Sequence, residues 1–147
     1  MDIRIAAYAV IIDDGRVLLS HWNQHGRSGW AMPGGGLQGA EDPLEAVVRE
    51  VREETGFDAA VDRLLGIDTM VVPAAKRHRG RVPLYAMRIV YRAHVVGGEL
   101  RNELDGSSDE ARWFPLDEVS SLKRVGLVDI ALRLDRDEPA DGGSKRR

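Results

Sequence analysis

The chain contains one helix whose two ends are both marked in the sequence, and this helix constrains most strongly how the rest can fold. Asp42 is a suitable N-cap, Pro43 suits the first helical position, and Glu45 completes an Asp-x-x-Glu capping box. At the other end, Gly56 can take the left-handed conformation that ends many helices. The pattern predicts a helix over residues 43–55, against which the remaining elements must pack.

One face of this predicted helix carries three carboxylates. Glu50, Glu53 and Glu54 stand at positions i, i+3 and i+4, which places them one turn apart on the same face. Three like charges on one face repel one another, and in the alternative of a solvated helix face Arg49 and Arg52 balance them. Clustered carboxylate oxygens are the ligands that a hard divalent cation such as magnesium prefers. The spacing therefore indicates a metal site, with a solvated helix face as the alternative.

A glycine run precedes the helix. Pro33 fixes its own φ and favours an extended conformation for the residue before it. Residues 34–36 are all glycine, so the backbone there can approach another group closely. Gly35 and Gly36 are therefore candidates for binding a substrate, and a flexible turn is the alternative.

The remaining sequence alternates between expected strands and helical segments. Apolar and β-branched stretches predict strands over residues 3–12 and 17–22, joined by a turn at 13–16, one or two strands over 57–72, a long strand over 82–96 and a short strand over 111–114. Loops are expected at 23–29, 73–80 and 102–110, a helical turn at 115–119 and a last helix at 125–134. This order predicts an α/β fold in which helices cover both faces of a sheet.

Length and composition exclude several classes of protein. A length of 147 residues predicts one domain, which we assign to residues 1–135, and we expect the charged segment 136–147 to be disordered. The net charge of −3 gives no overall basic field for a nucleic-acid polymer. The chain has no cysteine, which excludes disulfides, thiolate zinc sites and cysteine nucleophiles. No apolar run approaches the roughly 18 residues of a membrane span, so we expect a cytoplasmic protein without a membrane partner.

The stretch 35–57 resembles the Nudix box of the Nudix hydrolases, Gly-x5-Glu-x7-Arg-Glu-U-x-Glu-Glu-x-Gly-U, in which U is a bulky apolar residue. Every specified position is filled, by Gly35, Glu41, Arg49, Glu50, Val51, Glu53, Glu54, Gly56 and Phe57. The segments 30–35 (WAMPGG) and 112–115 (RWFP) also resemble the family. The resemblance implies an α/β/α sandwich with a mixed sheet, in which the box forms a loop-helix-loop.

The resemblance also implies an activity. Family members hydrolyse a nucleoside diphosphate linked to another group, using magnesium or manganese, which implies a nucleoside triphosphate, a nucleotide sugar or a dinucleoside polyphosphate as the small-molecule substrate. It implies that Glu50, Glu53 and Glu54 carry the metal chemistry, and that Glu41 and Arg49 interact to fix the shape of the box. Dimers are frequent in the family, so a homodimer is a candidate assembly that the sequence leaves open.

The chemistry of diphosphate cleavage agrees with this resemblance. A divalent ion that bridges phosphate oxygens neutralises their charge and can lower the pKa of a bound water. One carboxylate must accept the proton of that water, and we expect this base to be Glu53, with Glu50 and Glu54 as the firmest ligands. Arg49 completes the expected catalytic set.

Two loops supply further candidates. Family members often take a carboxylate ligand from outside the helix, and in the acidic loop we prefer Glu103 to Glu110 for this role. The alternative is that both are plain loop charges. In the basic loop, an arginine fork such as that of Arg79 could grip substrate phosphates, with a solvated surface as the alternative.

Two other functions fit parts of the pattern. A catalytically silent Nudix-fold module that binds a nucleotide and regulates another protein would be expected to have lost box carboxylates, whereas this chain keeps them. The isopentenyl-diphosphate isomerase branch of the same fold needs an active-site cysteine, which this chain lacks. A metal-dependent diphosphate hydrolase is therefore the leading hypothesis, and a non-catalytic nucleotide-binding module is the alternative.

Overall fold

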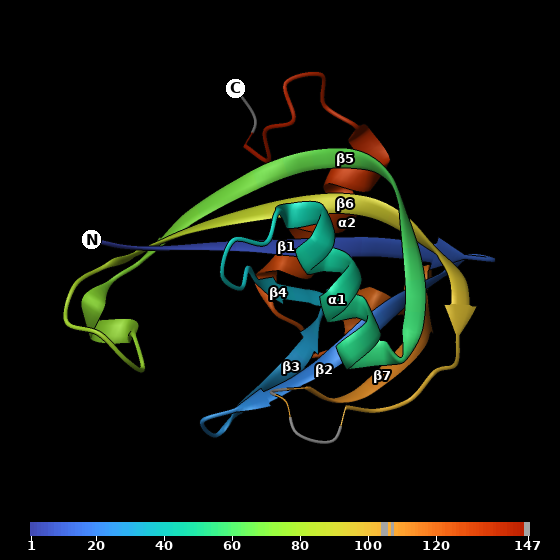
Figure 1. Cartoon of the computed structure of the whole chain (residues 1–147), viewed down its shortest axis with the longest axis horizontal. Coiled ribbons are helices and arrows are strands. Elements are labelled where there is room, and N and C mark those ends of the chain that lie inside the picture. Colours follow the sequence, from blue (N-terminus) through green and yellow to red (C-terminus); the bar gives the residue numbers. More distant parts are fainter. Residues whose placement is uncertain (104–105, 107, 146–147) are drawn as a thin grey trace.

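The computed structural model describes residues 1–103, 106 and 108–145, which form a three-layered fold (Figure 1). A mixed sheet lies in the middle, with helix α1 on one face and helix α2 on the other. In chain order the elements are β1 (Asp2–Asp13), β2 (Arg16–Gln24), β3 (Arg27–Ala31), β4 (Gly34–Gly36), α1 (Pro43–Thr55), β5 (Phe57–Val72), the 3-10 turn η1 (Ala74–Lys76), β6 (Leu84–Gly98), β7 (Ser108–Pro115), the 3-10 turn η2 (Leu116–Ser121) and α2 (Gly126–Asp137). The expected α/β/α sandwich is confirmed.

The first strand organises the sheet, whose order is β3-β2-β1-β6-β5. β6 runs parallel to β1 along one edge, from the pair Asp2 and Leu84 to the pair Ile11 and Ala93. On its other edge, β1 pairs antiparallel first with β4 and then, near its end, with β2. β7 pairs antiparallel with β2, and β5 with β6. Because β4 precedes α1 in the chain, the pairing of β4 with β1 places the approach to that helix beside β1.

Alternation along β1 divides the core into two clusters, because successive side chains of a strand point to opposite faces. Ala9 and Ile11 face α1, where they join Val47 and Val51. Val10, between them, belongs to the second cluster on the side of α2. Each helix therefore buries its apolar stripe against one face of the same strands.

Helix α1 begins and ends as its sequence predicts. The side chain of Asp42 accepts a hydrogen bond from the backbone N–H of Glu45 at 2.8 Å. Gly56 has a φ of 82°, and its N–H donates to the carbonyl of Arg52 at 3.0 Å. The predicted bounds of this helix are confirmed. Within the described part of the chain, neither α1 nor any other helix is long and apolar enough to cross a lipid bilayer.

The loop expected at 23–29 and the glycine run, for which a flexible turn was the alternative, both contribute to strands. Residues 23–29, expected as a loop, instead complete a hairpin in which Gln24 pairs with Arg27. His25 and Gly26 form its tight turn, with φ of 53° and 74°. The glycine run likewise forms β4, where Gly35 pairs with Ala7. In both places backbone pairing with a distant or neighbouring strand decides the conformation, although the side chains are polar or absent.

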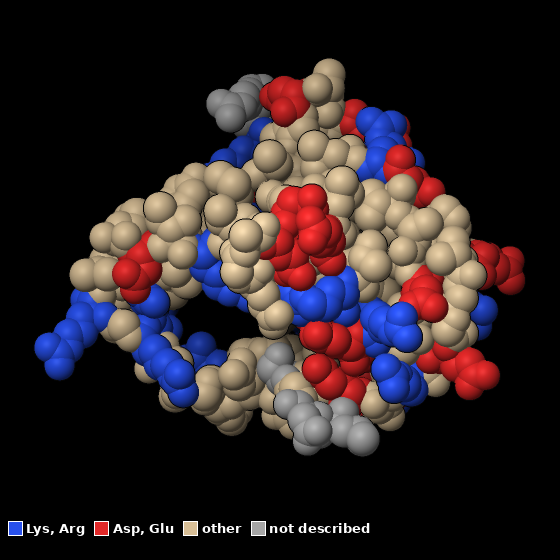
Figure 2. Space-filling view, in the orientation of Figure 1, with Lys and Arg blue, Asp and Glu red and all other residues tan. Residues whose placement is uncertain are grey.

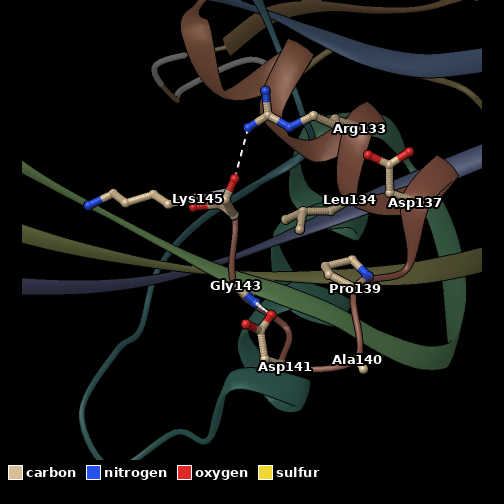
Figure 3. A pocket seen from close by; sticks show the side chains of 9 residues that line it. Arg133, Leu134, Asp137, Pro139, Ala140, Asp141, Gly143 and Lys145 are labelled. Atoms are coloured by element: carbon tan, nitrogen blue, oxygen red, sulfur yellow. Dashed lines mark hydrogen bonds between the residues drawn. The ribbon is translucent and has the colours of Figure 1, made fainter. Parts of the chain in front are cut away.

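The end of the chain, for which we expect disorder from residue 136, is described as far as Lys145. Helix α2 continues to Asp137, and the following segment returns to β5. There the N–H of Ile67 donates to the carbonyl of Gly142 at 2.7 Å. Arg133 also donates to the carbonyl of Ser144 at 3.0 Å, and the two enclose a cavity of about 530 Å³ with the segment between them (Figure 3). The segment has few apolar side chains, so backbone pairing and these polar contacts hold it in place.

Candidate functional site

A pocket of about 470 Å³ lies where the glycine strand β4 meets helix α1 and the first half of β1. Its lining includes Glu50 and Glu54 from α1, Gly35 from β4, and two arginines of the sheet, Arg4 and Arg88. This size is typical of a pocket for a small ligand. In Figure 2 acidic and basic side chains lie next to one another over α1, and the molecule is hollowed beside them.

Arg49 fixes the loop that leads into the helix. Its Nε and Nη2 donate to the two carboxylate oxygens of Glu41 at 2.8 and 2.9 Å, a bidentate pair. Nη2 also donates to the carbonyl of Gly36 at 3.1 Å. The pKa of Glu41 is lowered, first of all by its hydrogen bond with Arg49. The contact between Glu41 and Arg49 that the family resemblance implies is present.

The same guanidinium joins two of the predicted catalytic carboxylates. Nη1 of Arg49 donates to Oε1 of Glu50 at 3.0 Å and to Oε2 of Glu53 at 3.1 Å. The side chain of Glu53 is 46% exposed, whereas that of Glu50 is 15% exposed. Glu53 is therefore held beside Glu50 but faces water.

Glu54 is the most buried of the three carboxylates, at 7% exposure. Its Oε2 accepts from the N–H of Gly34 at 2.7 Å, and its Oε1 accepts from the hydroxyl of Ser108 at 3.2 Å. Burial raises the pKa of Glu54 well above its usual range, and the charges of Glu50 and Glu103 raise it further. This carboxylate is costly to ionise without a cation nearby.

The pKa of Glu50 is also raised, and the position of its carboxylate explains why residue 35 is glycine. Burial raises the pKa of Glu50, and the charge of Glu53 adds to the shift, while Arg49 opposes it. A Cβ atom at Gly35 would lie 2.7 Å from Oε1 of Glu50, closer than real contacts allow. Gly35 is therefore required for the carboxylate of Glu50 to lie against β4.

The donor set fits a hard divalent cation. Glu50 and Glu54 both line the pocket, and each resists ionisation because of burial and the charge of a neighbouring carboxylate. A divalent cation between such carboxylates would stabilise their charged forms. The structure does not bring Glu53 into the lining with them, and among the described residues no three His, Asp or Glu side chains are grouped closely enough to hold a metal ion.

The two further carboxylates of the acidic loop differ in their surroundings. Glu103 is half-buried, and its charge raises the pKa of Glu54, so the two carboxylates lie near each other. Glu110 lies in β7, where its carboxylate accepts from Nε of Arg112 at 2.9 Å. Three residues of this loop, Leu104, Asp105 and Ser107, lie outside the described residues.

Two arginines in the pocket were missed by the analysis of the sequence. Arg4 in β1 and Arg88 in β6 lie on neighbouring parallel strands, since Arg4 pairs with Ala86 and Ala6 with Arg88. Nε of Arg88 donates to Oδ2 of Asp68 at 2.9 Å. A charged residue inside an otherwise apolar strand was the signal that could have pointed to them. The predicted substrate residue Arg79 is not in this pocket, but lines a second hollow next to it.

Comparison with known proteins places this fold and box in one family. The family model described as NUDIX domain matches residues 2–132. An ADP-ribose pyrophosphatase from Methanocaldococcus jannaschii is 34% identical over 119 residues, which cover 80% of this chain and 65% of that protein. An RNA pyrophosphohydrolase from Halorhodospira halophila is 32% identical over 150 residues, which cover 90% of this chain and 82% of that protein.

Solved structures with a similar fold include members of the same family. The structure of a NUDIX hydrolase from Nitrosomonas europaea matches with a TM-score of 0.78 at 25% identity, covering 92% of this chain and 90% of that chain. The present chain is shorter than several relatives, since it spans 65% of the archaeal pyrophosphatase and 38% of another curated relative. The family match over nearly the whole fold, together with the complete box, shows that this chain belongs to the Nudix family.

Proposed function

We propose that this protein is a divalent-metal-dependent hydrolase that cleaves the diphosphate linkage of a nucleoside diphosphate derivative. The observation that carries the proposal is the pairing of Glu50 and Glu54, two carboxylates with raised pKa values, in a pocket that also contains Arg4 and Arg88. Carboxylates suit a metal ion, and guanidinium groups suit phosphate oxygens. The relatives named as pyrophosphatases support the same chemistry.

In this proposal, Glu50 and Glu54 hold the metal, and Glu53 and Glu103 are the further candidate ligands. Bound Mg²⁺ or Mn²⁺ would supply charge neutralisation at the diphosphate and lower the pKa of a water. The fixed position of Glu54 supports this assignment, because Gly34 and Ser108 hold both of its oxygens. Such a ligand needs little reorganisation when the metal binds.

Glu53 is the proposed general base. Its exposed carboxylate is accessible to water, and Arg49 holds it beside Glu50. The attacking water would give its proton to Glu53 while its oxygen forms a bond to phosphorus. The bond from phosphorus to the bridging oxygen breaks, and the leaving phosphate keeps the electron pair. Arg49 acts here by positioning two carboxylates.

The substrate phosphates are proposed to bind Arg4 and Arg88, with Gly35 and Gly36 bringing the backbone close to them. Arg88 uses Nε and Nη2 on Asp68, and within the described contacts its Nη1 makes no hydrogen bond. That group can therefore donate to a phosphate oxygen without releasing its partner. Arg4 is exposed and lies against Gly36, where a Cβ atom would be 3.4 Å from its Nη2.

The test is a substrate panel with the purified chain, containing ADP-ribose, nucleoside triphosphates and diadenosine tetraphosphate. We expect release of a phosphorylated product in Mg²⁺ or Mn²⁺ and no release in excess chelator. In the Glu54→Gln variant we expect the rate of release to fall by at least about a hundredfold. Tight nucleotide binding without cleavage of any substrate in either metal would contradict the proposal and favour the non-catalytic module.

A further inference from the structure

A second hollow, of about 800 Å³, lies next to the catalytic pocket and is lined by basic side chains. The two spaces share Arg4, Trp22 and Gln24 in their walls, so they adjoin one another. The walls of this basic groove include the β2–β3 hairpin and the segment from η1 to Arg79. Figure 2 shows an opening on this side of the molecule, with basic side chains beside it. A molecule seated on Glu50 and Glu54 can therefore extend into the basic groove.

Two contacts hold the segment after η1 in place. The rings of His25 and His78 stack with their centroids 3.5 Å apart and 19° between planes, which joins the hairpin turn to this segment. Nη1 of Arg77 donates to Oδ2 of Asp2 at 2.7 Å and to the carbonyl of Val82 at 2.6 Å. Arg77 is thus occupied in holding the segment, and its neighbours are presented to the groove.

Most of the basic side chains of this groove form no ion pair within the described residues. Within residues 1–103, 106 and 108–145, none of the residues that line it is Asp or Glu. Over the same ranges four of its cations form no ion pair: Arg4, Arg27, Lys76 and Arg79. The pKa of His25 is lowered by loss of solvation and by the charges of His78 and Arg79. An anion in the groove would relieve that repulsion.

We propose that the basic groove binds phosphates of the substrate that lie beyond the cleaved linkage, which makes linear polyphosphate compounds such as dinucleoside polyphosphates the preferred substrate class. This inference rests on the proposed function, because the groove is read as an extension of that site. Clustered guanidinium and ammonium groups recognise successive phosphates. In a nucleotide sugar the part beyond the diphosphate is uncharged, and it would leave these cations without partners.

A binding experiment tests the groove without relying on turnover. Inorganic tripolyphosphate is titrated by calorimetry into the chain in the absence of divalent metal, and into the double variant Lys76→Gln/Arg79→Gln. We expect the double variant to bind at least about tenfold more weakly, since each lost charged hydrogen bond weakens affinity by about that factor. Arg63→Gln is the matched control, because Arg63 is an exposed arginine of β5 that pairs with Glu138 outside the groove. Equal binding by the wild type and the double variant would overturn the inference.

Kinetics then test the substrate class. With diadenosine tetraphosphate, Lys76→Gln/Arg79→Gln is expected to raise KM at least about tenfold with little change in kcat, and with ADP-ribose to change KM less than about twofold. An equal effect on both substrates would contradict a role in recognising distant phosphates. A higher kcat/KM for ADP-ribose than for diadenosine tetraphosphate would contradict the proposed class. If no substrate is cleaved, the proposed function fails, and the tripolyphosphate titration still decides whether the groove binds phosphate.

Discussion

The hydroxyl of Ser144 donates to Oδ1 of Asp68, 76 positions earlier in the chain, at 2.5 Å. The other oxygen of Asp68 accepts from Arg88, which lines the pocket beside Glu50 and Glu54. Both Asp68 and Ser144 are buried, at 4% and 7% exposure. The end of the chain, far from the Nudix box in sequence, therefore supports the orientation of an arginine in the candidate site.

Replacing Asp68 or Ser144 should weaken substrate binding more than it lowers the turnover rate. In Asp68→Asn, the guanidinium of Arg88 loses its charged acceptor, so we expect a KM increase of about three- to thirtyfold with kcat within about twofold. The free energy of unfolding should fall by about 1–3 kcal/mol, because a buried charged hydrogen bond is lost. Ser144→Ala should show a smaller shift of KM in the same direction. Steady-state kinetics and thermal unfolding measure both effects.

Asp62→Asn is the matched control for Asp68→Asn. Asp62 is an exposed residue of the same strand β5, and it contacts His94 away from the pocket. It should leave KM unchanged. If Asp68→Asn lowered stability but left KM at the wild-type value, Arg88 would not depend on this support.

The position of Glu50 against β4 leads to a prediction for Gly35→Ala. The added methyl would lie 2.7 Å from Oε1 of Glu50, so the carboxylate must move away from its present place. We expect the Mg²⁺ concentration for half-maximal rate to rise at least about fivefold and kcat/KM to fall by about ten- to a hundredfold. Gly126→Ala is the control, because a Cβ atom there meets nothing within 4 Å. An unchanged magnesium titration in Gly35→Ala would remove Glu50 from the metal site.

The exposed position of Glu53 beside Arg49 leads to a prediction about the base. Glu53→Gln should keep the fold and KM close to those of the wild type and lower kcat by at least about a hundredfold, because the amide cannot accept the proton. Glu118→Gln, at an exposed carboxylate of η2 outside the pocket, should have no effect on kcat. Near-native turnover by Glu53→Gln would exclude Glu53 as the base.

The pair of Arg124 and Asp129 leads to a prediction about pH and stability. Nε of Arg124 donates to Oδ1 of Asp129 at 2.7 Å, and this bond is the main reason why the pKa of Asp129 is lowered. A carboxyl whose pKa is lower in the folded state stabilises the fold above its unfolded pKa of about 3.9, and this contribution is lost as the pH falls through the folded value.

The wild type should therefore exceed Asp129→Asn in Tm at pH 7, and the difference should shrink as the pH is lowered from about 5 to 2. Thermal unfolding of both proteins across this range measures the difference. A difference in Tm that stayed constant across the range would contradict the assignment of the shifted pKa to this carboxyl.

The sequence predicts helix α1 because its signals are local. The N-cap Asp42 and the terminal Gly56 lie within a turn of the groups they satisfy, so pattern and structure agree. The contact between Glu41 and Arg49 is similarly close in sequence, and the family pattern already contains it. The box and its approximate geometry could therefore be predicted.

The remaining parts of the site depend on pairing between distant segments. The strand conformation of Gly35 comes from its neighbour Ala7 in β1, which no local pattern reveals. Arg88 reaches the pocket only because β6 runs parallel to β1. The final segment contacts Asp68 and Ile67, about 75 residues before it, and its charged composition does not reveal these partners.

If Glu50 and Glu54 hold a divalent cation in this pocket, crystals of the chain grown with Mn²⁺ should contain the ion there. Anomalous scattering at the manganese absorption edge identifies the ion without any substrate. We expect a peak within about 2.5 Å of a carboxylate oxygen from both residues, and loss of that peak in Glu54→Gln crystals grown identically. Wild-type crystals with no manganese peak against either carboxylate, in a protein that also cleaves no nucleotide, would contradict this expectation.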